Sequence, residues 1–232
     1  MQGRSNTFVT LSTILGILCV FMNPDAQSRT EVGPIESVGF KVGTDSETAI
    51  SGKSGIKQQA TITKVSSNTF AMRGLEWKEG GDLPCRIQTL LRSLNDGSDT
   101  PTGWYWQECP GENWGNKKEA SLDSNSRYYV RGLAVCDSKN KGNNRIKGIK
   151  VYAAKVWKTK EQIDLIKSPV AASHANCGTW KPAVYCPSGS IAHGVIIHTE
   201  LETALFGGSG KSAVGFALKC AEVSWERHPV SD

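Results

Sequence analysis

Residues 186–223 read CPSGSIAHGVIIHTELETALFGGSGKSAVGFALKCAEV, and this stretch decides the fold class. From Val214 to Cys220, bulky residues alternate with small or polar ones, which is the period of a strand with one buried face. Upstream, Gly194 opens the apolar run VIIHTE, and the loop FGGSG at 206–210 supplies the glycines that a tight turn requires. The stretch therefore predicts a strand, a loop and a second strand.

The same design occurs twice more upstream, at residues 126–156 and 34–65. Gly39, Gly132 and Gly194 take the same place in the three copies, and each copy ends on a valine that follows Lys or Glu. Repeats of this length are typical of pseudosymmetric folds in which neighbouring units bury each other's apolar faces. Coincidental resemblance among glycine-punctuated strands is the alternative. We expect an all-β chain with three-fold pseudosymmetry.

One segment between the first two copies has a helical period. Its apolar positions Ile87, Leu90, Leu91 and Leu94 fall at i, i+3, i+4 and i+7. Asp82 stands where an N-cap would lie, and Gly97 follows the last leucine. The pattern predicts a short helical insertion near 84–96 that packs over a sheet edge.

The N-terminus has the pattern of a secretory signal peptide. Arg4 precedes an apolar run from Phe8 to Met22, and Ala26 is a small residue suited to cleavage. The run is shorter than an ordinary membrane span, and no second stretch of spanning length follows. We expect residues 1–26 to be removed, and residues 27–232 to form a single secreted, extracellular domain with no transmembrane segment.

Six cysteines remain after that removal: Cys85, Cys109, Cys136, Cys177, Cys186 and Cys220. An even number fits an oxidising compartment and up to three disulfides, although six cysteines allow fifteen pairings. The close Cys and His spacings of a zinc site do not occur. Our expected pairs are Cys85–Cys109, Cys177–Cys186 and Cys136–Cys220.

Catalytic patterns are sparse. GGSGKS at 207–212 resembles a phosphate-binding loop, but a leucine stands where the first glycine of that motif is required. His193 and His198 lie five residues apart on a predicted strand, so they face opposite sides and cannot share a metal. Glu200 and Glu202 share a face and could serve glycoside hydrolysis, yet a solvated strand end explains them equally. We expect no catalytic residue, cofactor or metal.

Two groups of residues are candidates for carbohydrate binding. The basic group is Lys139, Lys141 and Arg145, in a loop rich in Asn and Gly. The aromatic group is Trp104, Trp106 and Trp180, whose rings can stack on sugars or can be buried in the core. Because the protein is expected to be secreted, an acidic polysaccharide is a better partner for this basic group than nucleic acid. A solvated surface is the alternative for the basic loop.

A further set of residues recurs in two copies of the repeat. It consists of Trp180, Cys186, Pro187, Gly189, Gly194, Glu200 and the run 214–220, with Trp104, Trp106, Cys109, Pro110, Gly111 and Gly132 in the second copy. On these residues the chain resembles the vitelline membrane outer layer protein family, well over residues 177–223 and less well over 103–156. The Asp-Asp-Thr-Ala-like turn of that family is missing, and the predicted helix is foreign to it. A dermatopontin-like group, which shares the run YYVRG at 128–132, is the second candidate.

The first resemblance implies a β-prism, in which three Greek-key sheets surround a pseudo-threefold axis, secreted into an extracellular coat and suited to carbohydrate binding. Its contact loops would be 43–54, 137–145 and 201–211. The expected function is therefore a non-enzymatic, lectin-like or coat protein whose partners are extracellular glycans or coat proteins. A glycan-active enzyme and a membrane-active toxin or defence protein are the alternatives.

Overall fold

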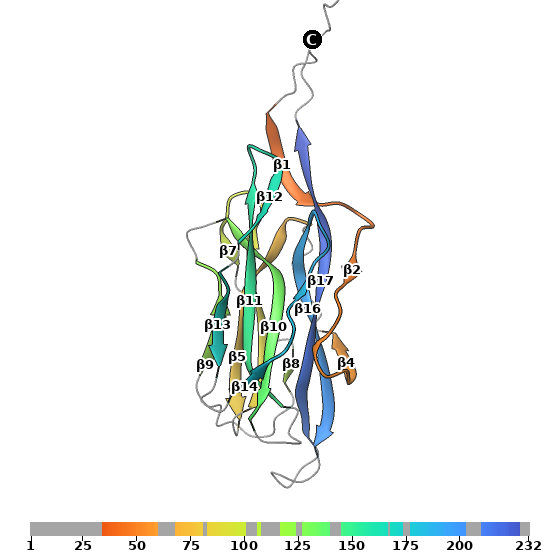
Figure 1. Cartoon of the computed structure of the whole chain (residues 1–232). Helices are drawn as coiled ribbons and strands as arrows, with labels where there is room; N and C mark the ends of the chain where they lie inside the picture. Colours follow the sequence, from red (N-terminus) through yellow and green to blue (C-terminus); the bar gives the residue numbers. More distant parts are fainter. Residues whose placement is uncertain are drawn as a thin grey trace, which may run out of the picture. The chain divides into compact units, whose positions relative to one another are not determined.

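Three long antiparallel hairpins form the framework of the fold (Figure 1). The computed structural model describes residues 34–59, 68–80, 83–100, 106–107, 117–123, 127–139, 145–166, 168–173, 177–202 and 210–227. The hairpins pair β5 (Phe70–Gly80) with β6 (Leu83–Ser93), β10 (Tyr128–Ser138) with β11 (Ile146–Trp157), and β16 (Ser190–Glu202) with β17 (Gly210–Arg227). The predicted all-β class is confirmed.

Short edge strands flank each hairpin on both sides. They are β1 (Ile35–Phe40), β2 (Ser46–Glu47), β3 (Ser51–Gly52), β4 (Ile56–Gln59), β7 (Asp99–Thr100), β8 (Trp106–Gln107), β9 (Lys117–Ser121), β12 (Gln162–Leu165), β13 (Val170–Ser173), β14 (Cys177–Trp180) and β15 (Val184–Tyr185). Within each sheet, the edge segment lies along one hairpin strand and then along the other, which is the strand order of a Greek key.

The three sheets draw their edge strands from different parts of the chain. The β5–β6 sheet has the order β7-β6-β5-β9, with β8 also on β6, and the β10–β11 sheet has the order β12-β11-β10-β14, with β13 on β11 and β15 on β10. In both, the edges follow their hairpin in sequence. The β16–β17 sheet has the order β1-β17-β16-β4, with β2 and β3 on β17, so the N-terminal segment completes the sheet of the last hairpin.

A β-bulge occurs at the same point of each hairpin. The pairing register shifts between Met72 and Gly74, between Val130 and Gly132, and between Ala192 and Gly194. The extra, unpaired residue is Arg73, Arg131 or His193. Because one residue is inserted, the positions that face the core change from odd to even, or from even to odd, at this point of the strand. The residue before each bulge and the residue after its glycine therefore both face the core, as Val130 and Leu133 do.

The expected first repeat, residues 34–65, is wrong in one respect. Its glycine, Gly39, lies in the edge strand β1 opposite Ser224, and β1 and β4 pair with the last hairpin rather than with each other. Gly74 takes the place beside a bulge that Gly132 and Gly194 take in the other hairpins. Residues 34–59 are therefore an edge segment, not a hairpin.

The helical insertion predicted near 84–96 is also wrong, because residues 83–93 form strand β6 and no helix occurs among the described residues. Ile87 and Leu91 lie on the core face of the strand, whereas Leu90 pairs with Gly74. Leu94 follows the strand and joins a separate apolar cluster. Long-range pairing with β5 therefore overrides the local helical spacing.

In the part of the chain described, no helix has the length and apolarity needed to cross a membrane.

One hydrophobic core is shared by the three sheets. Its fully buried members include Trp77 on β5, Leu133 on β10 and Phe216 on β17. A second buried cluster, which contains Tyr129 and Leu94, lies next to it at one end of the strands. There the Tyr129 hydroxyl donates a 2.8 Å hydrogen bond to the Ser93 carbonyl, which ties the β10–β11 sheet to the β5–β6 sheet.

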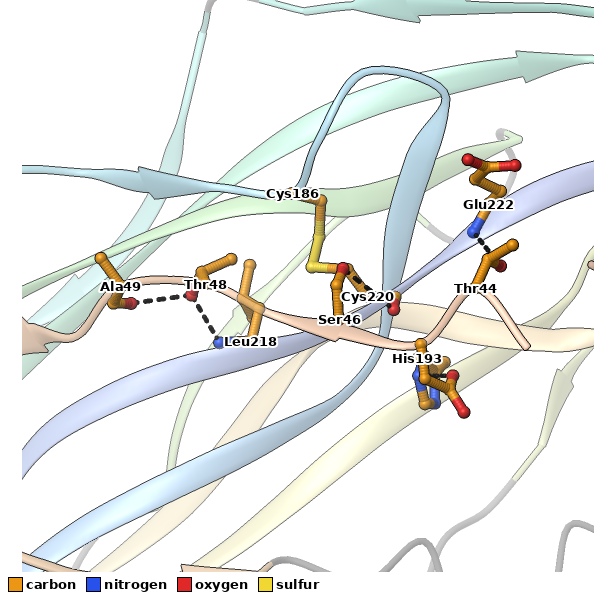
Figure 2. The surroundings of a disulfide bond; sticks show 10 residues. Thr44, Ser46, Thr48, Ala49, Cys186, His193, Leu218, Cys220 and Glu222 are labelled. Atoms are coloured by element: carbon orange, nitrogen blue, oxygen red, sulfur yellow. Dashed lines mark hydrogen bonds and ion pairs between the residues drawn. A yellow bond between two sulfur atoms is a disulfide. The ribbon is translucent and has the colours of Figure 1, made fainter. Parts of the chain in front are cut away.

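Two disulfides are described, and both differ from the expected pairs. Cys136 on β10 bonds Cys177 on β14, and Cys186 bonds Cys220 on β17 (Figure 2). The expected pairs Cys177–Cys186 and Cys136–Cys220 are therefore wrong. Cys136 bonds a neighbouring edge strand of its own sheet, because the Cα atoms are only 5.8 Å apart there. The expected pair Cys85–Cys109 lies outside the described residues.

Candidate functional site

The strongest candidate site is on the outer face of the β10–β11 sheet, where the bulge glycine allows an aromatic ring to lie on the backbone. Gly132 pairs with Tyr152 on one side and with Tyr185 on the other. A Cβ atom built on Gly132 would lie within 2.4 Å of the Tyr185 ring. Only glycine therefore leaves room for this ring. The equivalent glycine of the β5–β6 sheet, Gly74, has Ser121 at the same place.

Tyr152 and Tyr185 form an edge-to-face aromatic pair. Their ring centroids are 5.2 Å apart at an angle of 61°, which is a favourable arrangement for two aromatic quadrupoles. Tyr185 remains 44% exposed, so its ring stabilises the pair and still reaches solvent. Burial raises the pKa of the Tyr185 hydroxyl, and hydrogen bonding with Tyr152 raises it further, so Tyr185 is a neutral hydrogen-bonding group at physiological pH.

A tryptophan and a lysine extend this surface along the same sheet. Trp180 on β14 pairs with Cys136, and the Lys150 ammonium nitrogen lies 4.1 Å from the centre of the Trp180 ring. A cation at this distance is attracted by the ring and also keeps the ring in place. We call the set Tyr152, Tyr185, Trp180, Lys150 and Arg131 the aromatic face.

Arg131 adds a positive charge beside the tyrosines. It is the residue stepped over at the bulge, directly before Gly132, and its side chain is partly exposed. Its charge lowers the pKa of Tyr185, against the larger effect of burial. The Nε atom of Arg131 is buried without a hydrogen-bond partner among the described residues. The aromatic face therefore combines flat apolar rings with cations.

The predicted binding residues divide between sheets. Trp180 lies in the aromatic face. Lys139 directly follows β10 and Arg145 directly precedes β11, at the end of the sheet where β14 pairs. Trp106 lies on β8 in the β5–β6 sheet, opposite Ile87. Lys141 and Trp104 lie outside the described residues. The structure thus brings three of the six predicted residues to one sheet and places one elsewhere.

The two tyrosines are not among the binding residues predicted from the sequence. Tyr152 follows Val151 and precedes Ala153, both of which face the core, so the alternation of this strand already directs Tyr152 outward. What the sequence does not give is the partner, because Tyr185 reaches Gly132 only through the pairing of β15 with β10.

A second feature is a hollow of about 250 Å³ on the β16–β17 sheet. It is lined by Asp45, Ser46, Glu47, His193 and Lys219. The His193 Nε2 atom lies 3.1 Å from the Asp45 carboxylate. Burial lowers the pKa of His193, while Asp45 acts in the opposite direction, so the ring is uncharged at neutral pH.

Hydroxyl groups fix the segment that carries this hollow. The Thr44 Oγ1 atom accepts a 3.0 Å hydrogen bond from the Glu222 amide, and the Thr48 Oγ1 atom accepts one of 2.9 Å from the Leu218 amide (Figure 2). The Cys186–Cys220 disulfide lies next to these contacts. The mixed charges of the hollow select no ligand class.

Other chemistry finds little support among the described residues. No group of three or more His, Cys, Asp or Glu side chains is arranged to hold a metal ion in this part of the chain. Glu200, one of the two carboxylates considered for glycoside hydrolysis, forms a 2.5 Å ion pair with Lys53. The aromatic face is therefore the site whose geometry indicates a ligand class.

No protein-family model and no curated protein matches this chain. Among solved structures it is similar to the Vibrio cholerae biofilm matrix protein Bap1, with 12% identity and a TM-score of 0.41 over 83% of this chain and 27% of that one. It is also similar to the mosquito-larvicidal Cry4Aa toxin of Bacillus thuringiensis, with 11% identity and a TM-score of 0.39 over 65% of this chain and 27% of the toxin. The agglutinin of Calystegia sepium shows 12% identity and a TM-score of 0.35, over 78% of this chain and 99% of the agglutinin. These values are low, and they assign no function to the chain.

Proposed function

We propose that this protein is a secreted, non-enzymatic carbohydrate-binding protein whose ligand binds the aromatic face. The observation that carries the proposal is the exposed Tyr185 ring, which lies on Gly132 and packs edge-to-face against Tyr152. A ring fixed in this way offers a flat apolar surface to the CH groups of a sugar, and its hydroxyl can bond a sugar hydroxyl. Little conformational entropy is lost on binding, because the ring is already ordered.

Two broader parts of the proposal rest on the sequence and the topology together. We propose secretion because residues 1–26 have the pattern of a signal peptide, and disulfides are characteristic of oxidising compartments. We propose that the three sheets are copies of one Greek-key unit in a β-prism, because each hairpin has its bulge directly before a glycine. Extracellular glycans, or coat proteins that carry them, are the proposed partners.

A glycan array followed by calorimetric titration of the best ligand tests the proposal. Replacing Tyr185→Ala should weaken binding about 10-fold, the effect of losing roughly 1.4 kcal/mol of stacking. Leu165→Ala is a matched control, because Leu165 is an apolar side chain of the same sheet that is 47% exposed. Equal affinity of the Tyr185→Ala variant and the control would exclude the aromatic face as the site.

A further inference from the structure

The bulge places a side chain with a cationic or titratable nitrogen at the same point of each hairpin. These side chains are Arg73 on β5, Arg131 on β10 and His193 on β16, and each directly precedes the bulge glycine. None of them takes part in the ladder, so each side chain is free to meet the edge segment of its own sheet. The three positions can therefore be compared directly.

At two of the three positions the edge segment supplies a carboxylate. The Arg73 Nε atom lies 3.1 Å from Asp99 Oδ2, and its Nη1 atom lies 3.6 Å from Glu119 Oε1. The His193 Nε2 atom lies 3.1 Å from Asp45 Oδ1. In both sheets a carboxylate of the protein therefore faces the side chain at the bulge.

Arg131 differs from the other two. Among the described residues it has no carboxylate partner. Its Nε atom is buried without a hydrogen bond, as are Arg73 Nε and His193 Nε2, but each of those two atoms has a carboxylate within 3.1 Å. The edge strand that faces it, β15, supplies Tyr185 instead of an acid. A guanidinium has a strong preference for planar, bidentate contact with a carboxylate, and an unpaired one at a partly buried position is costly.

We propose that the ligand of the aromatic face contains a uronic acid, whose carboxylate binds Arg131 while its sugar ring stacks on Tyr185. This inference rests on the proposed function and specifies its substrate class. The carboxylate of the ligand takes the place beside Arg131 that Asp99 and Glu119 take beside Arg73.

The test uses the full secreted chain and pairs of oligosaccharides that differ in one group. Fragments of hyaluronan, alginate and polygalacturonate are each compared by calorimetry with the same fragment after reduction of its carboxyl groups to alcohols. At least one acidic fragment should bind, and its reduced form should bind about 10- to 100-fold more weakly, the effect of losing one charge-assisted hydrogen-bonded pair.

Variants assign that effect to Arg131. Arg131→Gln should weaken binding of the acidic fragment by the same factor, so that the acidic and reduced fragments bind this variant with similar affinity. Arg131→Lys, which keeps the charge but loses the planar fork, should fall between the two. Lys41→Gln is the matched control, because it removes one exposed positive charge on another sheet and should have no effect. If Arg131→Gln does not fold, the comparison of acidic and reduced fragments with the unmodified chain still decides the question.

Each other outcome overturns the inference in a distinct way. Binding that requires Tyr185 but is equal for acidic and reduced fragments would leave the proposed function standing and refute the role of the carboxylate. Binding restricted to sulfated glycans and lost in Arg131→Gln would refute the uronic acid. Failure of every oligosaccharide, neutral or acidic, would refute the inference and the proposed function together.

Discussion

Removal of the Cys186–Cys220 disulfide should cost a large part of the protein's stability. This bond closes a loop with a sequence separation of 34 residues. In the chain-entropy model, closing a loop of this length lowers the entropy of the unfolded chain by about 12.6 cal/mol/K. This corresponds to a stabilisation of about 3.8 kcal/mol at 25 °C. The Cys136–Cys177 bond, with a separation of 41 residues, gives almost the same figure, about 3.9 kcal/mol.

The perturbation is the double variant Cys186→Ala and Cys220→Ala. Alanine is preferred to serine because both cysteines are buried, at 2% and 0% exposure, and a serine hydroxyl would have no certain partner there. The free energy of unfolding, measured by urea denaturation without reductant, should fall by about 4 kcal/mol. The thermal midpoint should fall by roughly 8–15 °C, as expected for a domain of this size.

A matched variant and an additivity test make the reasoning refutable. Cys136→Ala with Cys177→Ala should lose a similar amount, and the loops 136–177 and 186–220 do not overlap, so the two losses should add. The combined loss of about 8 kcal/mol is comparable with the total stability of a typical domain, about 5–15 kcal/mol, so the fourfold variant should retain little stability or none. A loss below about 1 kcal/mol in either double variant would refute the loop-entropy reasoning.

Three further predictions concern single residues. Tyr129→Phe should lower the free energy of unfolding by about 1 kcal/mol, because its hydroxyl bonds the Ser93 carbonyl in a buried cluster; an unchanged urea midpoint would contradict this. Burial lowers the pKa of His193 below the ordinary histidine value of 6.5, so the unfolded chain binds more protons than the folded chain in this pH range. Stability from this group should be complete above pH 6.5 and fall as the pH drops below it, and His193→Asn should flatten that slope in a series of thermal melts. Gly52→Ala should destabilise the fold more than Gly43→Ala, since both have positive φ but only Gly52 has backbone atoms, at 2.6 Å, where the new Cβ would lie; equal losses would contradict the steric argument.

Strands whose side chains alternate between buried and exposed could be predicted from the sequence. The predictions were wrong for segments whose structure depends on which strands pair. Phe216 and Leu218 could be placed on the core face because their own strand carries the period-2 signal. The β6 segment misled because Ile87, Leu90 and Leu91 match a helical face, and only pairing with β5 shows that Leu90 faces away from the core. Alternation is local information, whereas pairing is not.

The misplaced first repeat has a related cause. Gly39 and Gly132 were matched because each is a glycine within a strand pattern. A bulge also requires that the residue before the glycine leaves the ladder. Gly74, and not Gly39, has an arginine at that position, as Gly132 does. The predicted disulfide pairs were wrong for another reason, because the spacing of cysteines in the sequence does not show which strands become neighbours. Cys177 could bond Cys136 only after β14 had been placed beside β10.

The division of labour between hairpins and edge segments explains where binding specificity can arise in this fold. The hairpins fix the position of the bulge residue, because moving the bulge by one residue would turn the core face outward. The edge segments carry no such constraint. One supplies Asp99 to Arg73, another Asp45 to His193, and the third supplies Tyr185 to Arg131. A sheet whose edge segment supplies an acid already places a carboxylate beside the bulge residue, and a sheet whose edge segment supplies a ring leaves that place for a ligand. It follows that exchanging one residue of β15, as in Tyr185→Asp, should close the Arg131 site while the hairpin beneath it remains intact.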